Sequence, residues 1–155
     1  MFSQCLTLIA KVVKMKNLNI TAFLLALGIF ASLPVSAQKT EWLKAATPVF
    51  AELKDEVSSE DAKEGQRIEF TVTDQVVSDN NIPLIATGAM AYGRVKRITE
   101  YEMEIEIQFV KSVTGKIIHL EGTLKGKRSK RQCCVIFNQN TPITGRVKDN
   151  TALLL

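Results

Sequence analysis

The stretch that decides the fold runs from Arg67 to Val95 and reads RIEFTVTDQVVSDNNIPLIATGAMAYGRV. Its first part places apolar Ile68, Phe70 and Val72 at every second position, which is the period of a strand with one buried face. Ser78 to Asn81 then supplies a run of turn-forming residues. The stretch therefore predicts strands joined by a turn, and it is the seed of an all-β fold.

The second part of the same stretch carries small residues on one strand face. Ala89, Ala91 and Gly93 share that face with Val95. Such a row lets another element approach closely, or it marks a bend where a sheet curls. Both interpretations remain open from the sequence.

Glutamates alternate with apolar residues immediately downstream, which predicts a strand over residues 100–108. The inward set is Tyr101, Met103, Ile105, Ile107 and Phe109, and the outward set is Glu100, Glu102, Glu104 and Glu106. Carboxylates in a row repel one another unless a neighbouring strand supplies cations. We expect Arg94 and Lys96 to do so from positions opposite Glu104 and Glu102, which requires a connecting loop with an odd number of residues.

A second hairpin is predicted around Thr114 and Gly115. This turn sets Phe109 opposite Leu120 and Ile107 opposite Gly122, so that the apolar faces agree.

Two further strands complete the predicted sheet. One covers residues 132–137, and the chain ends in the apolar run Ala152 to Leu155, which we expect to dock as a last strand. The fold class predicted from these patterns is all-β: a small antiparallel barrel or sandwich of about six to eight strands after an N-terminal signal peptide.

Residues 1–37 have the features of a secretory signal peptide. Lys16 precedes an apolar run from Leu18 to Ala31, and Val35-Ser36-Ala37 is a small-residue cleavage motif. The run is shorter than the roughly 20 residues that a bilayer crossing requires, so we expect no transmembrane span in the mature chain. Met15 is a better start for such a signal than Met1. Cleavage after Ala37 leaves one β-rich domain at residues 38–155.

Removal of the signal changes the charge balance. The full chain has a formal net charge of +4, and loss of Lys11, Lys14 and Lys16 without any acid leaves +1. The basic character of the whole sequence is therefore no indication of nucleic-acid binding.

Several short pieces occur in an order that resembles a family of small exported bacterial cell-envelope β-domains of uncharacterised function. The pieces are Thr47-Pro48-Val49, Val57-Ser58-Ser59, Gly65 before Ile68–Val72, Ile85, Gly88-Ala89, Gly93-Arg94-Val95 and Gly115–Gly122. The spacing of Trp42, Ala46, Phe50, Leu53 and Val57 slightly favours a helix on its own. The resemblance implies instead a strand over residues 47–53. It brings no catalytic residues, and the chain departs from it in its basic segment after Gly126 and its short C-terminus.

That basic segment is the most distinctive candidate for binding. Five cations within seven residues, here called the basic tip, are Lys125, Lys127, Arg128, Lys130 and Arg131. They could attract anionic lipid headgroups or an acidic polysaccharide. Aromatic residues that would stack on bases are absent from the segment, which argues against nucleic acid. The alternative is a solubilising hairpin tip that protects a sheet edge.

Residues suited to catalysis or metal binding are few. His119 is the single histidine, and with Glu121 as neighbour it falls short of the three or four ligands of a zinc site. Asp74, Asp79, Asn80 and Asn81 gather in one polar turn but lack the pattern of a calcium loop. We therefore predict no metal, no cofactor and no catalytic residue.

The mature chain contains one adjacent pair of cysteines, Cys133 and Cys134. Neighbours on a strand point to opposite faces, so we expect at least one thiol in the core. Nearby cations would lower the pKa of the other thiol.

The function expected from the sequence is that of an exported, non-catalytic module of the periplasm or cell envelope. Its partner would be an envelope protein or an anionic polymer or lipid. One alternative is an enzyme of unfamiliar type that uses His119, Glu121 or a cysteine. Another is a structural subunit that docks through residues 152–155.

Overall fold

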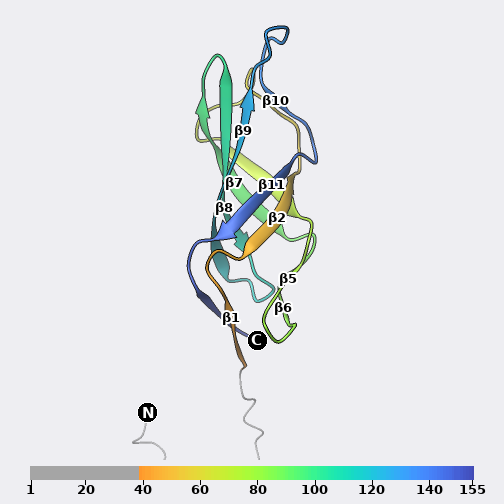
Figure 1. Ribbon diagram of the computed structural model, residues 1–155, viewed down its shortest axis with the longest axis vertical. Helices are drawn as coiled ribbons and strands as arrows, with labels where there is room; N and C mark the ends of the chain where they lie inside the picture. Colours follow the sequence, from red (N-terminus) through yellow and green to blue (C-terminus); the bar gives the residue numbers. More distant parts are fainter. Residues whose placement is uncertain (1–38) are drawn as a thin grey trace, which may run out of the picture. The chain divides into compact units, whose positions relative to one another are not determined.

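The computed structural model describes residues 39–155, so the predicted signal peptide and the start at Met15 lie outside the described part. This part is all-β, as predicted (Figure 1). Its strands are β1 (Thr40–Leu43), β2 (Pro48–Leu53), β3 (Val57–Ser58), β4 (Arg67–Val72), β5 (Val76–Val77), β6 (Pro83–Ile85), β7 (Met90–Ile98), β8 (Glu102–Lys111), β9 (Ile117–Lys127), β10 (Ile136–Phe137), β11 (Pro142–Val147) and β12 (Thr151–Leu154).

Six of the strands close into an antiparallel barrel in the order β11-β2-β4-β7-β8-β9. The remaining strands form three two-stranded ribbons, β1 with β12, β3 with β10 and β5 with β6. The barrel interior is filled by apolar side chains, among them the fully buried Phe70, Val49, Ile105 and Ile118. Small barrels are filled in this way, so binding sites have to be sought on the outer surface.

The stretch that decides the fold supplies β4 and β7, which are direct neighbours in the barrel. Ile68 pairs with Gly93 and Phe70 with Ala91. A Cβ atom on Gly93 would overlap the carbonyl oxygen of Glu106 on β8. The register also shifts between Tyr92 and Gly93. The small residues therefore serve both of the proposed purposes, a close approach and a local bend.

The predicted register of β7 against β8 has the correct faces but is displaced by two residues. Arg94 lies opposite Glu106, not Glu104, and Val95 lies opposite Ile105. Because the displacement is an even number, the cations still face the glutamates. The predicted loop with an odd number of residues is wrong, because Ile98 pairs with Met103 and four residues lie between them. A second register shift, between Val95 and Arg97, compensates for the even loop, so that Arg94 still lies opposite a glutamate.

The β8–β9 hairpin follows the prediction only up to a bulge at Gln108. Ile107 lies opposite Gly122 as expected, but Phe109 lies opposite His119 and not Leu120. The bulge turns Phe109 outward, where its ring packs on Tyr92 at a centroid distance of 5.2 Å, and Val110 is buried instead. Tyr101 was also predicted to face inward, but it precedes β8 and is 59% exposed.

The segment for which helical spacing competed with a strand is the strand β2. Val49, Ala51 and Leu53 are buried, while Phe50 faces solvent. The helical spacing was misleading, and the strand implied by the resemblance is confirmed.

The strand predicted over residues 132–137 is wrong except at its end, because only Ile136 and Phe137 pair, with β3. The preceding residues form a loop that is fixed by hydrogen bonds between Ser59 and Val135.

The C-terminus docks as a last strand, as predicted. β12 pairs with β1 over four residue pairs, from Thr40 opposite Leu154 to Leu43 opposite Thr151. Leu153 is fully buried in this arrangement. Within residues 39–155 no helix is long and apolar enough to cross a bilayer.

Candidate functional site

The glutamate row of β8 lies between two rows of cations. On the β7 side, Arg94 Nε lies 2.8 Å from Glu106 Oε1, and Lys96 Nζ lies 2.9 Å from Glu104 Oε1. On the β9 side, Lys125 Nζ lies 3.6 Å from the same oxygen of Glu104. The antiparallel order β7-β8-β9 produces this arrangement, since it places the outward residues of three neighbouring strands side by side.

Glu104 is the best-compensated carboxylate of the row. Its side chain is 15% exposed, and both Lys96 and Lys125 contact it. The hydrogen bond from Lys96 is the main reason why the pKa of Glu104 lies below its usual value, and the charge of Lys125 acts in the same direction against partial burial.

The basic tip is not a free cluster of charge, because three of its five cations are paired. Besides Lys125, the ammonium of Lys127 lies 3.2 Å from Glu102 and the guanidinium of Arg128 lies 3.2 Å from Glu100. Arg128 also lies over the ring of Tyr101, with 4.8 Å between Cζ and the ring centroid. The first part of the tip belongs to β9, which the Arg128 amide extends by donating to the Tyr101 carbonyl, and Lys130 and Arg131 follow in a turn.

Cations nevertheless outnumber carboxylates on this surface. Among the residues that the structure describes, Arg97, Lys130 and Arg131 form no ion pair, and all three are exposed. We call the outward side of the β7–β8 hairpin from Arg94 to Glu106, together with residues 125–131, the cationic face. Its cations are Arg94, Lys96, Arg97, Lys125, Lys127, Arg128, Lys130 and Arg131, set against Glu100, Glu102, Glu104 and Glu106, an excess of four positive charges.

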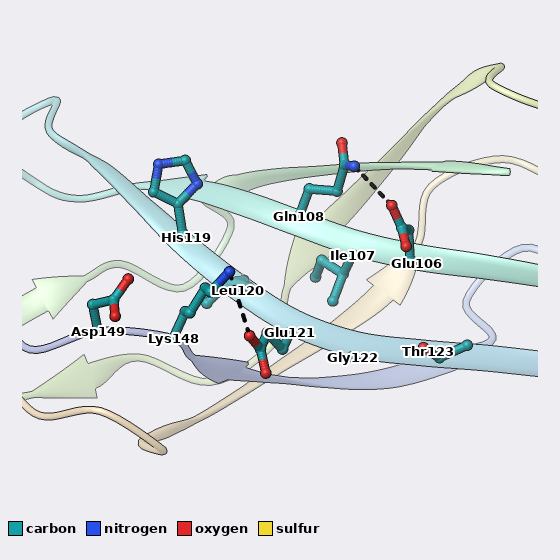
Figure 2. Close-up of a pocket in the computed structure, with 10 residues that line it drawn as sticks. All are labelled: Glu106, Ile107, Gln108, His119, Leu120, Glu121, Gly122, Thr123, Lys148 and Asp149. Atoms are coloured by element: carbon teal, nitrogen blue, oxygen red, sulfur yellow. Dashed lines mark hydrogen bonds and ion pairs between the residues drawn. The ribbon is translucent and has the colours of Figure 1, made fainter. Parts of the chain in front are cut away.

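His119 and Glu121 line an open groove of about 460 Å³ between β8, β9 and the residues after β11 (Figure 2). The register of β8 against β9 shifts beside the groove, between Ile107 and Phe109. At Gly122 the next strand, β11, comes so close that a Cβ atom would overlap the carbonyl oxygen of Thr144.

The polar groups of this groove are not organised around the histidine. Figure 2 shows two interactions, from Gln108 to Glu106 at 2.8 Å and from Lys148 to Glu121 at 3.7 Å, and neither includes His119. The imidazole is exposed, and no hydrogen bond within residues 39–155 orients it. A general base needs a second group that fixes its tautomer and direction. The groove can hold a small polar molecule, but it lacks this feature of a catalytic histidine.

The two cysteines lie at a chain bend and not on a strand. Their Sγ atoms are therefore on the same side, 3.2 Å apart and hydrogen-bonded, which differs from the expectation of opposite faces. Cys134 is buried, as predicted for one of the pair, and Cys133 is exposed.

The expected lowering of a thiol pKa is wrong for Cys133. Its pKa is raised, first by the hydrogen bond with Cys134 and then by the charge of that neighbour and partial burial. The guanidinium of Arg128 contacts the Cys133 carbonyl, to which it donates, and pairs with Glu100.

The polar turn of Asp79, Asn80 and Asn81 uses its polar groups for contacts within the protein. The Asn80 amide donates to both carboxylate oxygens of Glu41, at 3.1 and 3.0 Å, and Asp79 pairs with Lys44 at 2.8 Å. Glu41 is itself buried, and the hydrogen bond from Lys39 is the main cause of its lowered pKa. The turn thus fastens β1 to the β5–β6 ribbon.

One residue of interest could not be found from the sequence. The β3–β10 ribbon brings Glu60 beside the cysteine pair, so that its carboxylate and both Sγ atoms lie within 4.8 Å of one another. Glu60 lies in a charged loop more than seventy residues before Cys133 and carries no local motif. Glu60 and the cysteines are brought together by the pairing of β3 with β10, two strands of two residues each.

Comparison with known proteins identified no protein family that matches the chain and no curated protein with a significant match. The surfaces described above are therefore the basis on which a function can be assigned.

Proposed function

We propose that this protein is an exported, non-catalytic β-barrel module of the cell envelope that binds an anionic surface through its cationic face. The observation that carries the proposal is the excess of four positive charges on that face. The unpaired Lys130 and Arg131 provide the charges that are most available to a partner.

The paired cations also contribute to such binding. The side chains of Lys125 and Lys127 are 70% and 80% exposed, and exposed ion pairs are worth little individually. These lysines can therefore reorient toward an external phosphate or carboxylate at small cost. The glutamates pair with these cations and reduce the net charge of the face. Because the remaining attraction for one anion is weak, many anions on a dense surface are needed for binding.

The two alternatives have less support. For an enzyme at His119 and Glu121, the groove supplies space but no group that orients the imidazole. For a subunit that docks through residues 152–155, the difficulty is that β12 is already paired with β1 and Leu153 is already buried. Only the exposed side chains of Leu154 and Leu155 remain to meet a partner.

The proposal is tested by cosedimentation of the protein with lipid vesicles and by binding to an acidic polysaccharide. We expect association with vesicles that contain phosphatidylglycerol, none with pure phosphatidylcholine, and weakening as salt is added. Each cation near an anionic surface contributes about 1 kcal/mol, so K130Q/R131Q should weaken binding roughly 30-fold at low ionic strength.

A matched control removes the same charge at the other end of the β8–β9 hairpin. K111Q/K116Q neutralises two exposed lysines there, and we expect little change in affinity. An equal loss in both double variants would mean that net charge alone drives association, which contradicts a role for the cationic face. Absence of binding to every anionic probe would refute the proposal as a whole.

Export is tested separately. Protein recovered from the envelope fraction of its native host should begin at Gln38, as determined by N-terminal sequencing. Recovery only from the cytoplasm with Met1 or Met15 intact would contradict export and leave the measured vesicle affinity unaffected.

A further inference from the structure

The loop after β9 and the loop after β3 meet at a pair of thiols. Ser59 and Val135 are joined by two hydrogen bonds of 2.9 Å, one between their backbones and one from the Val135 amide to the Ser59 hydroxyl. These bonds fix the residues on either side of the contact, Glu60 on one loop and Cys134 on the other. The carboxylate of Glu60 and the two Sγ atoms consequently occupy one small region.

The spacing of the two sulfur atoms is compatible with a shared metal ion. Zn–S bonds of about 2.3 Å in tetrahedral geometry place two sulfur ligands about 3.8 Å apart, whereas a disulfide requires about 2.05 Å. The observed separation of 3.2 Å lies closer to the first value. Cys133 is exposed, so its side chain can open the pair by the required few tenths of an ångström.

The surroundings suit an ion that keeps one position open. Cys133, Cys134 and Glu60 line a pocket of about 380 Å³ that opens to solvent and also includes Glu100 and Arg128. Three protein ligands with a water molecule in the fourth position are a recurrent zinc arrangement. Two thiolates and a carboxylate around a divalent cation leave one negative charge, and Arg128 lies beside it with a guanidinium nitrogen 3.4 Å from the Cys133 carbonyl oxygen.

We propose that Cys133, Cys134 and Glu60 form a binding site for a thiophilic divalent cation of the Zn²⁺ class. Binding replaces the proton of each thiol by a metal–sulfur bond, so one ion releases two protons to solvent and no oxidant or reductant is involved. The site does not depend on the proposed anion binding, because its three ligands are not among the cations of the cationic face. Thiolate ligands select such ions over Ca²⁺ and Mg²⁺.

The test is a titration of the reduced, metal-free full chain with Zn²⁺ against a chromophoric chelator, after a count of free thiols. We expect one ion per chain, no competition from Ca²⁺ or Mg²⁺, and an affinity that rises with pH. Substitution of Co²⁺ or Cd²⁺ should give the near-ultraviolet charge-transfer absorption of thiolate ligands. Proton release, measured in buffers of different ionisation enthalpy, should approach two per ion.

Two variants locate the ion without disturbing the core. C133S changes an exposed residue and should weaken Zn²⁺ binding at least tenfold with loss of the charge-transfer band. E60Q should also weaken binding at least tenfold, and D61N serves as its control because Asp61 is the neighbouring carboxylate outside the cluster. Thermal melts and circular dichroism establish that each variant is folded.

Three results of the titrations would overturn the proposal. They are no Zn²⁺ binding by the reduced wild type, unchanged binding by C133S, and equal affinities for E60Q and D61N. A disulfide between Cys133 and Cys134 that persists under reductant would overturn it as well, because neither sulfur could then act as a thiolate ligand.

Discussion

Replacement of Gly93 by alanine should destabilise the barrel more than replacement of any turn glycine. Gly93 lies on β7 next to β8, and a Cβ atom there would overlap the carbonyl oxygen of Glu106 and lie 3.0 Å from the Cα of Ile107. The obstacle is backbone, which cannot rotate away as a side chain can. Overpacking of a tight site costs typically 1–3 kcal/mol, and we expect G93A to reach about 3 kcal/mol or more.

Gly115 provides a matched control because only its conformation is demanding. It has a φ of +80° in the turn between β8 and β9, and nothing lies within 4 Å of an added Cβ atom. The left-handed conformation costs a non-glycine residue roughly 1–2 kcal/mol, and the stiffer unfolded chain offsets about 0.4–1 kcal/mol of this. G115A should therefore cost about 1 kcal/mol, and G126A should lie between the two variants because its obstacles are the side chains of Val135 and Phe137.

Urea unfolding followed by circular dichroism measures these differences. The midpoints should decrease in the order wild type, G115A, G126A, G93A, with an unchanged dependence of the unfolding free energy on urea. Equal losses in G93A and G115A would refute the reasoning, because they would mean that the close approach of β7 and β8 relaxes without cost.

Two further predictions concern the charged row and the C-terminus. The pKa of Glu104 is lowered in the folded protein, so the carboxylate stabilises the fold above the pKa of the unfolded chain, and this stabilisation is lost as the pH falls through the folded value. E104Q should therefore be less stable than wild type at neutral pH and equally stable in acid. A difference in stability that persists in acid would contradict this. L153A should lower the unfolding free energy by about 2–5 kcal/mol, because it leaves a cavity at a fully buried site. L154A, at a 57% exposed position, should change it by less than about 0.5 kcal/mol, and urea unfolding measures both effects. Similar effects of the two substitutions would argue against β12 as a structural strand.

The long strands could be predicted from the sequence because their two faces differ in polarity. In β4, β8 and β9 the alternation is regular over at least six residues, and a half-buried sheet requires this alternation. Face assignment survived even where the register was displaced, since Arg94 and Lys96 still reach the glutamates. The face of a strand on which a residue lies is thus predicted more reliably than its exact partner on the next strand.

The departures from prediction occur where one residue is inserted or where a strand is very short. The bulge at Gln108 reverses the faces beyond it, and it leaves Phe109 half-buried at a position where alternation predicts full burial. The ribbon of β3 and β10 has two residues on each side, too few for any periodicity. The cysteine pair and Glu60 depend on that ribbon, which explains why the sequence did not reveal this site.

The charge row illustrates a different difficulty. Lys125, Lys127 and Arg128 form a cluster when they are counted along the chain, but in the barrel they face Glu104, Glu102 and Glu100 across one strand boundary. A count along the sequence cannot register partners that are more than twenty residues away. The charges that remain available are fewer than the cluster suggests, and Arg97 joins them from another strand.

The pairing of β1 with β12 has a mechanical consequence. Thr40 lies opposite Leu154 and the Leu155 amide donates to the Lys39 carbonyl, so the two ends of the described segment lie side by side. A tension applied to both ends would open the four pairs one after another, as in a zipper, and would not load them together in shear. The ribbon would therefore yield at low force, while the closed six-stranded barrel that it joins would retain its hydrogen bonds.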